Sequence, residues 1–169
     1  MRSSEQHKHE AARRGPLQVA LVTVSDSRTA ATDVNGSYLG EQIIAAGHSV
    51  ADQRIIPDDP EQLLSSLVEL AAGPAEIILI NGGTGISSRD TTFDVLNVAL
   101  EKTLPGFGEI FRYLSFKEIG SPAILSRATA GLYRGCVVFS MPGSPNAVRL
   151  AWEKLISPEI QHLAYEVGR

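Results

Sequence analysis

Short apolar runs alternate along this chain with longer segments in which apolar residues recur at helical spacing. The runs predict β-strands, and three of them are apolar at nearly every position, which is typical of strands buried on both faces of a parallel sheet. The predicted strands cover residues 17–24, 49–56, 77–80 and 136–141. The segments between them predict helices that begin near residues 35, 60, 91, 145 and 157, with a further helix around 110–119.

The helix that begins at Pro60 carries its own start signal. Proline fits the first helical position, which makes Asp59 the N-cap residue and Gln62 its capping-box partner. Asp58 has no comparable structural role, so it is the better candidate for function. The apolar stripe that we expect this helix to bury consists of Leu63, Leu64, Leu67, Val68 and Ala71.

The last strand is expected to be half of a hairpin. Arg134-Gly135 is typical of a two-residue turn between antiparallel strands, here over residues 128–133 and 136–141. The element order is then βα, βα, βα, an extra helix, a hairpin and βαα. This order predicts an α/β fold, a three-layer α/β/α sandwich with a mostly parallel sheet plus a β-hairpin.

Length and composition fit a single domain. Of the 169 residues, we expect 1–16 to form a disordered N-terminal tail and 17–169 to form one domain with a full core. In the tail, His7 and His9 could ligate a metal, although a solvated segment is the favoured interpretation. A net charge of −4 argues against a nucleic-acid-binding surface.

The same composition predicts a cytoplasmic location. The chain has no apolar run of membrane-spanning length and no secretion signal, so no membrane partner is expected. Cys136 is the one cysteine and lies in an apolar run, so it is expected to be a core residue in a reducing compartment.

The richest chemical signal is the turn at residues 82–90. Three glycines, Gly82, Gly83 and Gly85, follow a buried strand and precede a helix. Glycines permit positive φ and close approach, and the N–H groups at a helix start attract anions. The spacing excludes the nucleotide P-loop and the dinucleotide fingerprint. A tight strand-to-helix connection without a ligand remains the alternative.

Three more predicted strands end in polar or glycine-rich turns: Ser25-Asp26, Asp58 and residues 142–146. In an open α/β sheet such turns converge on one edge. Glycine turns that offer N–H groups, together with two carboxylates, suit a phosphorylated ligand and Mg²⁺. Two alternatives stay open: Asp90 could simply cap the helix that follows it, and Ser25-Asp26 could simply cap its own turn.

Several motifs, taken together and in this order, resemble the MoaB/MogA family of molybdenum cofactor biosynthesis. They are Gly82-Gly83-Thr84-Gly85, Arg89-Asp90, residues 105–108, Leu125-Ser126-Arg127 and residues 141–147. The resemblance runs from about Val19 to Leu163, and residues 112–120 look more like the MoaB branch than the MogA branch. It implies a MogA-like fold.

The resemblance also implies an activity: Mg²⁺- and ATP-dependent adenylylation of molybdopterin with release of pyrophosphate. The family's two essential aspartates match Asp58 and Asp90, as catalytic and metal-holding residues, and its substrate-side serine matches Ser126. The other implied substrate- or phosphate-binding residues are Ser25, Asp26, Gly82, Gly83, Thr84, Gly85, Pro142, Gly143, Ser144 and Asn146. On physical grounds, Arg89 or Arg127 could add a cationic contact to the substrate phosphates, although Arg127 could equally be a surface ion-pair partner.

One departure from the family pattern lies beside the site, because Phe93 stands where a proline commonly follows the threonine. The alternative functions are a catalytically inactive molybdopterin-binding or carrier protein and a scaffold of the same pathway. The resemblance further implies a homo-oligomer, trimer or hexamer, and partners among other molybdenum cofactor biosynthesis proteins.

Overall fold

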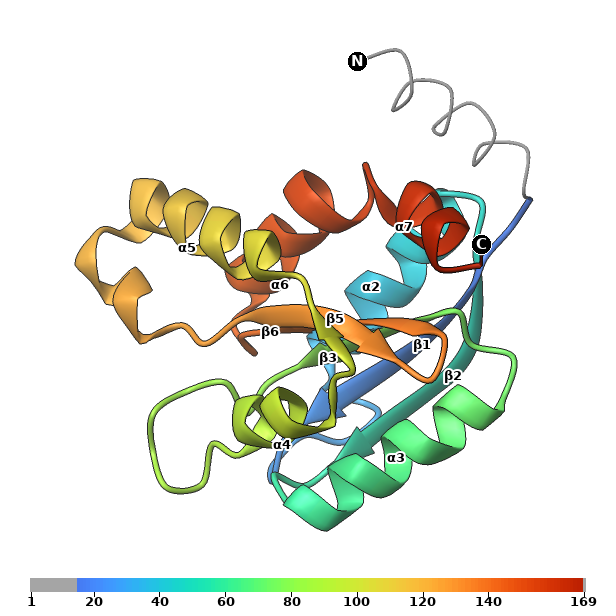
Figure 1. Cartoon of the computed structure of the whole chain (residues 1–169). Coiled ribbons are helices and arrows are strands. Elements are labelled where there is room, and N and C mark those ends of the chain that lie inside the picture. Colours follow the sequence, from blue (N-terminus) through green and yellow to red (C-terminus); the bar gives the residue numbers. More distant parts are fainter. Residues whose placement is uncertain (1–14, 169) are drawn as a thin grey trace.

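The computed structural model describes residues 15–168, so almost all of the expected tail, residues 1–16, lies outside the described part of the chain. Its centre is a six-stranded sheet in the order β2-β1-β3-β6-β5-β4. β2, β1, β3 and β6 run parallel to one another (Figure 1). β5 pairs antiparallel with β6, and β4 pairs antiparallel with β5. The strands are β1 Gln18–Val24, β2 Ser49–Ile56, β3 Ile77–Asn81, β4 Lys102–Thr103, β5 Thr129–Tyr133 and β6 Cys136–Met141.

Helices cover both faces of this sheet (Figure 1). One face packs against α2 Val34–Ala45, α5 Pro105–Ile119, α6 Pro145–Ala151, the π-helical turn η2 Trp152–Ile156 and α7 Ile160–Val167. The other face packs against α3 Pro60–Ala72 and α4 Thr92–Ala99, and a 3-10 turn, η1 Ser121–Leu125, follows α5. The predicted three-layer α/β/α sandwich with a mostly parallel sheet is therefore confirmed.

Strand periodicity explains the two cores. Along β3, Ile77 and Leu79 join the cluster on the α2 side, whereas Ile78 and Ile80 join the cluster on the α3 side. All four side chains are fully buried, as expected for a central parallel strand. Cys136 is a buried core residue, also as expected. Within residues 15–168, no helix has the length and apolar character needed to cross a bilayer.

The β5–β6 hairpin follows the sequence prediction closely. Arg134 and Gly135 both have positive φ, 46° and 84°, which is the signature of a type I′ turn. β4 was not predicted, because two residues are too few to produce an alternating pattern. It pairs with β5 and extends the antiparallel edge of the sheet.

The start of α3 is as predicted, but part of its buried stripe is not. Asp59 accepts a hydrogen bond from the Gln62 N–H at 2.9 Å, which confirms it as the N-cap. Leu64 and Val68 are exposed, and Leu70 is buried in their place. The helix has apolar residues over more than one face, and packing on the sheet selects the face that carries Leu63, Leu67 and Leu70.

The last helix also begins later than predicted, at Ile160 rather than near residue 157. The preceding helix explains the difference. α6 continues directly into the π-helical turn η2, which carries the helical backbone through Ile156, and the Ser157 N–H still bonds to the Trp152 carbonyl. The Ser157-Pro158 signal therefore falls at the end of one helix instead of the start of the next.

Four buried polar side chains tie the helix α2 to the strands beside the candidate site. Asn81 ends β3, and its Nδ2 donates to Thr23 Oγ1 at 3.0 Å. Thr23 in turn donates to Asp33, the N-cap of α2, at 2.8 Å. Asn35 Nδ2 donates both to Asn81 Oδ1 at 2.9 Å and to the Gly143 carbonyl at 2.8 Å. Asn35 thereby fixes the turn after β6 relative to β3.

We expect Asn35→Ala to lower the free energy of unfolding by about 2 kcal/mol, because it leaves the buried Asn81 Oδ1 and the partly buried Gly143 carbonyl without their donor. Urea unfolding followed by circular dichroism measures the loss. Asn97→Ala is the matched control, since Asn97 is an exposed helical asparagine, and its effect should stay within about 0.5 kcal/mol. Equal stability of the two variants would contradict the proposed importance of this network.

Candidate functional site

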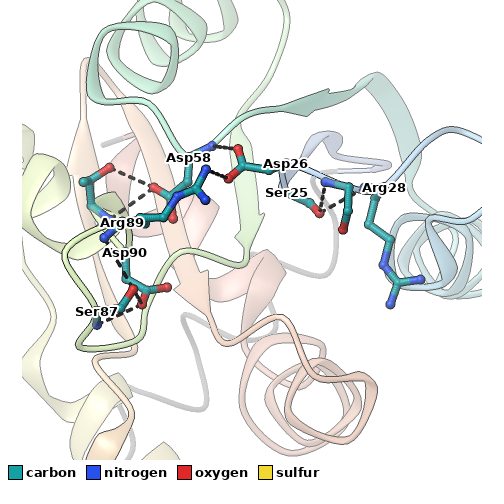
Figure 2. A network of polar contacts seen from close by, with 9 residues as sticks. Ser25, Asp26, Arg28, Asp58, Ser87, Arg89 and Asp90 are labelled. Atoms are coloured by element: carbon teal, nitrogen blue, oxygen red, sulfur yellow. Dashed lines mark hydrogen bonds and ion pairs between the residues drawn. The ribbon is translucent and has the colours of Figure 1, made fainter.

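The carboxyl ends of β1, β2, β3 and β6 lie along one edge of the sheet. The turns that follow these strands contact one another, and Figure 2 shows the contacts among the turns after β1, β2 and β3. The Asp58 N–H, after β2, donates to Asp26 Oδ1, after β1, at 3.2 Å. Arg89, in the turn after β3, pairs with Asp26 Oδ2 at 2.7 Å. The Gly82 N–H donates to the Met141 carbonyl at 3.0 Å, which joins the turn after β3 to the end of β6.

The glycine turn leaves no room for a side chain at Gly82 or Gly83. Gly82 and Gly83 have φ values of 100° and 65°. A Cβ atom on Gly82 would collide with the Val24 carbonyl oxygen, and one on Gly83 would collide with Thr92 Oγ1 and lie 2.9 Å from Asp58 Oδ2. The turn thus brings the backbone directly against the end of β1, the start of α4 and the carboxylate of Asp58.

Asp58 holds the start of a helix to which it does not belong. Its Oδ1 accepts hydrogen bonds from the Thr91 N–H at 3.1 Å and from Thr91 Oγ1 at 2.8 Å. The sequence interpretation that Asp58 lacks a structural role is therefore wrong, because this partner lies 33 residues away in the chain. The second oxygen, Oδ2, faces Gly83.

Asp90 is not the cap of α4. The N-cap residue is Thr91, which makes no side-chain capping bond, and Asp90 Oδ2 instead accepts hydrogen bonds from the Ser87 N–H at 3.0 Å and from Ser87 Oγ. These bonds close the turn that precedes the helix (Figure 2). The alternative of a helix cap for Asp90 is thus wrong, and the carboxylate lies beside Gly85.

The environment of Asp90 favours its ionised form. The hydrogen bond from Ser87 Oγ is the largest cause that lowers the pKa of this carboxyl below its usual value. The backbone N–H groups of Ser87 and Gly85 and the charge of Arg127 act in the same direction, and partial burial opposes them. Asp90 is therefore a carboxylate at neutral pH.

A cavity of about 350 Å³ opens beside these turns. Its polar side is formed by Asp90, Ser126, the glycine turn Gly82–Gly85 and the turn Pro142–Ser144. Its apolar side comes from α5 and η1 and consists of Phe111, Ile119, Pro122, Ala123 and Leu125. A ligand that carries both a phosphate and an apolar or aromatic group would match the two sides.

Not every predicted site residue lines this cavity. Asp26 and Asp58 lie in the adjoining turns, and Ser25 Oγ accepts bonds from the N–H groups of Ser27 and Arg28 at 3.3 and 3.1 Å within its own turn. Asn146 lies on α6 beside a separate cavity of about 110 Å³. The implied roles of these residues stay predictions.

Arg127 makes several contacts with the protein itself. It forms an ion pair with Asp94 at 2.9 Å, and its other nitrogens donate to the carbonyl groups of Gly85 and Asp90. Its guanidinium carbon also lies 5.0 Å from the centre of the Phe93 ring. Phe93 therefore packs against an arginine of the site where the family pattern commonly has a proline.

The cavity wall supplies little positive charge. Over residues 15–168, no Lys or Arg side chain is among those that line it, and the nearby Arg89 and Arg127 are paired with carboxylates. In the same part of the chain, no group of three or more His, Cys, Asp or Glu side chains could hold a metal ion. The Mg²⁺ site that the resemblance implies at Asp58 and Asp90 stays a prediction. Two carboxylates are chemically suited to Mg²⁺, since it binds through one or two carboxylates plus phosphate oxygens and water.

Sequence reasoning missed the residues that support the site. Ser87 precedes Asp90 by three positions, a spacing at which Ser and Asp side chains often close turns. Asn81, a polar residue at the end of an apolar run, was the available signal for the hydrogen bonds that link β3 to Thr23 and Asn35 beside the site. The contacts of Thr91 and Asn35 join segments far apart in the chain, and no local pattern predicts them.

Comparison with known proteins identifies the chain's relatives. The family model described as "Probable molybdopterin binding domain" matches residues 20–162. A Molybdenum cofactor biosynthesis protein B from Halalkalibacterium halodurans is 48% identical over 168 residues, which is 98% of this chain and 97% of that protein.

Two solved structures have the same fold and belong to related proteins. A crystal structure of a Molybdenum cofactor biosynthesis protein B has a TM-score of 0.89 at 44% identity and covers 91% of this chain and 97% of that one. The tungsten cofactor synthesizing protein MoaB from Pyrococcus furiosus has a TM-score of 0.82 at 34% identity, with 91% and 98% covered. The family model matches most of the chain, and the Halalkalibacterium halodurans relative is 48% identical along almost its whole length. The chain therefore belongs to the MoaB branch of the MoaB/MogA family of molybdenum cofactor biosynthesis proteins.

Proposed function

We propose that the protein adenylylates molybdopterin with ATP and Mg²⁺ and releases pyrophosphate. The observation that carries the proposal is the meeting of the glycine turn, the ionised carboxylate of Asp90 and Ser126 at one cavity, with Asp58 in the adjoining turn. Family membership supplies the substrate class, since the matching model describes a probable molybdopterin-binding domain.

Charge balance supports the requirement for Mg²⁺. Two polyanions, ATP and the phosphate of molybdopterin, must approach each other where the described cavity wall carries no Lys or Arg. Asp58 and Asp90 would hold the ion, because each is oriented through one oxygen, by Thr91 and Ser87 respectively. Bound Mg²⁺ would neutralise phosphate charge and polarise the phosphoryl oxygens.

The chemistry needs no covalent enzyme intermediate. An oxygen of the terminal phosphate of molybdopterin attacks the α-phosphorus of ATP, and a new P–O bond forms there. The bond between the α-phosphorus and the bridging oxygen breaks, and pyrophosphate leaves with that electron pair. The protein contributes position and charge stabilisation, with the N–H groups of the glycine turn available to phosphate oxygens and Ser126 on the substrate side.

A non-catalytic molybdopterin-binding or carrier role is the second candidate. One observation favours it: Asp58 and Asp90 each have a structural partner, so neither needs a metal to explain its position. A carrier would bind molybdopterin without consuming ATP. The cytoplasmic location expected from the sequence stays a prediction under either function.

We expect Asp58→Asn and Asp90→Asn each to reduce turnover by about 100-fold or more, because charge at the site is lost while an oxygen acceptor for Thr91 or Ser87 is kept. Chromatographic detection of adenylylated molybdopterin and pyrophosphate measures the rate. Asp59→Asn is the matched control, since it removes the neighbouring charge and keeps a good N-cap, and it should retain activity.

Two results would decide against the enzyme. Wild-type rates in both Asp58→Asn and Asp90→Asn would refute the metal-site assignment. Molybdopterin binding by the wild type without ATP consumption would establish the carrier function in its place.

Ser87→Ala should raise the pKa of Asp90 toward its ordinary value, because it removes the largest cause of the depression. A depressed folded-state pKa adds stability above the unfolded-state pKa, and that stability is lost as the pH falls through the folded-state pKa. The variant should therefore be less stable at neutral pH, and its difference from wild type should shrink in acid.

The measurement is an NMR titration of the Asp90 carboxyl carbon between about pH 2 and 6. Ser88→Ala is the control, since Ser88 is the exposed neighbour in the same turn. An unchanged Asp90 midpoint in Ser87→Ala would show that the hydrogen bond is absent in solution.

We also propose that the protein is a homo-oligomer, a trimer or a hexamer. Large apolar side chains on α5 and η1 are exposed, and such patches commonly mark interfaces: Ile110, Tyr113, Phe116, Ile119, Ile124 and Leu125. Sedimentation equilibrium at micromolar concentration should give a trimeric or hexameric mass. A monomer under those conditions would refute the proposal.

A further inference from the structure

Arg127 joins the two ends of the loop that carries Asp90. Its Nε–H donates to the carbonyl oxygen of Gly85 at 2.9 Å, and its Nη2 donates to the carbonyl oxygen of Asp90 at 2.7 Å. These carbonyl groups belong to the first and last residues of the 85–90 loop. One planar guanidinium group therefore closes the loop from the backbone side, while Ser87 holds the carboxylate of Asp90 from within.

Two residues of α4 orient that guanidinium group. Asp94 accepts from Nη1 at 2.9 and 3.0 Å through its two carboxylate oxygens. The Phe93 ring centre lies 5.0 Å from the guanidinium carbon, within the range of a cation–π contact. The Arg127 side chain is 25% exposed, so it is held between the loop and the helix instead of extending into solvent as a free cation.

We propose that Arg127 is a positioning residue, which fixes the 85–90 loop so that the Asp90 carboxylate is presented to Mg²⁺ beside Ser126. The part of this inference that concerns the metal rests on the proposed function. It differs from the role suggested by the sequence, a direct cationic contact of Arg127 with a substrate phosphate. The two roles make different demands on the side chain.

A lysine cannot fill the proposed role. The guanidinium group has five N–H donors in a fixed plane, and Arg127 directs three of its nitrogens at three separate partners. An ammonium group is a compact point charge, so it would keep attraction to a phosphate but would not span both carbonyl groups. Arg127→Lys therefore separates positioning from simple charge.

The test uses Arg127→Lys and Arg127→Gln with two measurements on each purified protein. The first is the pH titration of the Asp90 carboxyl carbon by NMR. The second is the Mg²⁺ concentration at half-saturation when Mg²⁺ is added to protein and ATP without molybdopterin, followed by the same carbon signal. Turnover is then measured separately with molybdopterin present.

Arg54→Gln is the matched control. Arg54 also has a side chain that is 25% exposed and also binds carboxylates, those of Asp52 and Glu69, but it lies on β2 against α3. Loss of Arg54 removes a comparable set of ion pairs without touching the 85–90 loop. It can lower the melting temperature, and it should leave both Asp90 measurements unchanged.

We expect Arg127→Lys and Arg127→Gln each to raise the half-saturating Mg²⁺ concentration by about 10-fold or more, as residues that orient metal ligands do. Both should also move the Asp90 titration to higher pH. An unchanged Asp90 titration and Mg²⁺ requirement, with a higher KM for ATP or molybdopterin alone, would overturn the inference in favour of a phosphate contact. A lower melting temperature as the sole effect would overturn it in favour of a merely structural role.

The inference and the proposed function can fail separately. If the wild type binds Mg²⁺ and ATP but makes no product, the proposed reaction fails, whereas the Asp90 titration and Mg²⁺ affinity still test Arg127. If the wild type turns over and the Arg127 variants leave both Asp90 measurements at wild-type values, the inference alone fails.

Discussion

Parallel pairing of β1, β2, β3 and β6 determines where this protein can carry chemistry. Parallel strands end at the same edge, so turns from four distant parts of the chain meet there. The strand ends also need hydrogen-bond partners at that edge, because they leave backbone N–H and C=O groups that must be satisfied. Asn35 and Asn81 provide some of these partners by linking α2, β3 and the Gly143 carbonyl through one buried and one partly buried hydrogen bond.

The sequence predicted most of the scaffold because local rules govern it. Nearly continuous apolar runs located β1, β3 and β6, and a mixed segment between two predicted helices located β2. Asp59 and Pro60 located the start of α3, and Arg134-Gly135 located the hairpin. Prediction failed where packing chooses among equivalent faces, as for Leu64 and Val68, and where a strand of two residues leaves no pattern, as in β4. The roles of individual site residues were harder still. Asp58 and Arg127 bind partners 33 or more residues away, and such contacts have no signature in either segment alone.

In Asp58 and in Asp90, one carboxylate oxygen has a structural partner and the proposed function uses the same carboxylate. Asp58 gives Oδ1 to Thr91, and Asp90 gives Oδ2 to Ser87, so each is oriented by the fold before any ligand arrives. Preorganisation of this kind reduces the entropy that a metal or phosphate must overcome on binding. It also couples the charge of Asp90 to the shape of its loop, since the same hydrogen bonds that lower its pKa close the turn.

The contacts of Arg127 have a consequence for the order of folding. Arg127 lies 42 residues after Gly85 and 37 residues after Asp90, so closing these contacts requires a long stretch of chain to be in place first. β3 itself pairs with β6, which follows Arg127 in the chain. The contacts that close the 85–90 loop can therefore form only once the chain extends through Arg127. During synthesis, the first two-thirds of the chain would contain every glycine of the turn and both aspartates, yet would lack the arginine that binds the carbonyl groups of Gly85 and Asp90.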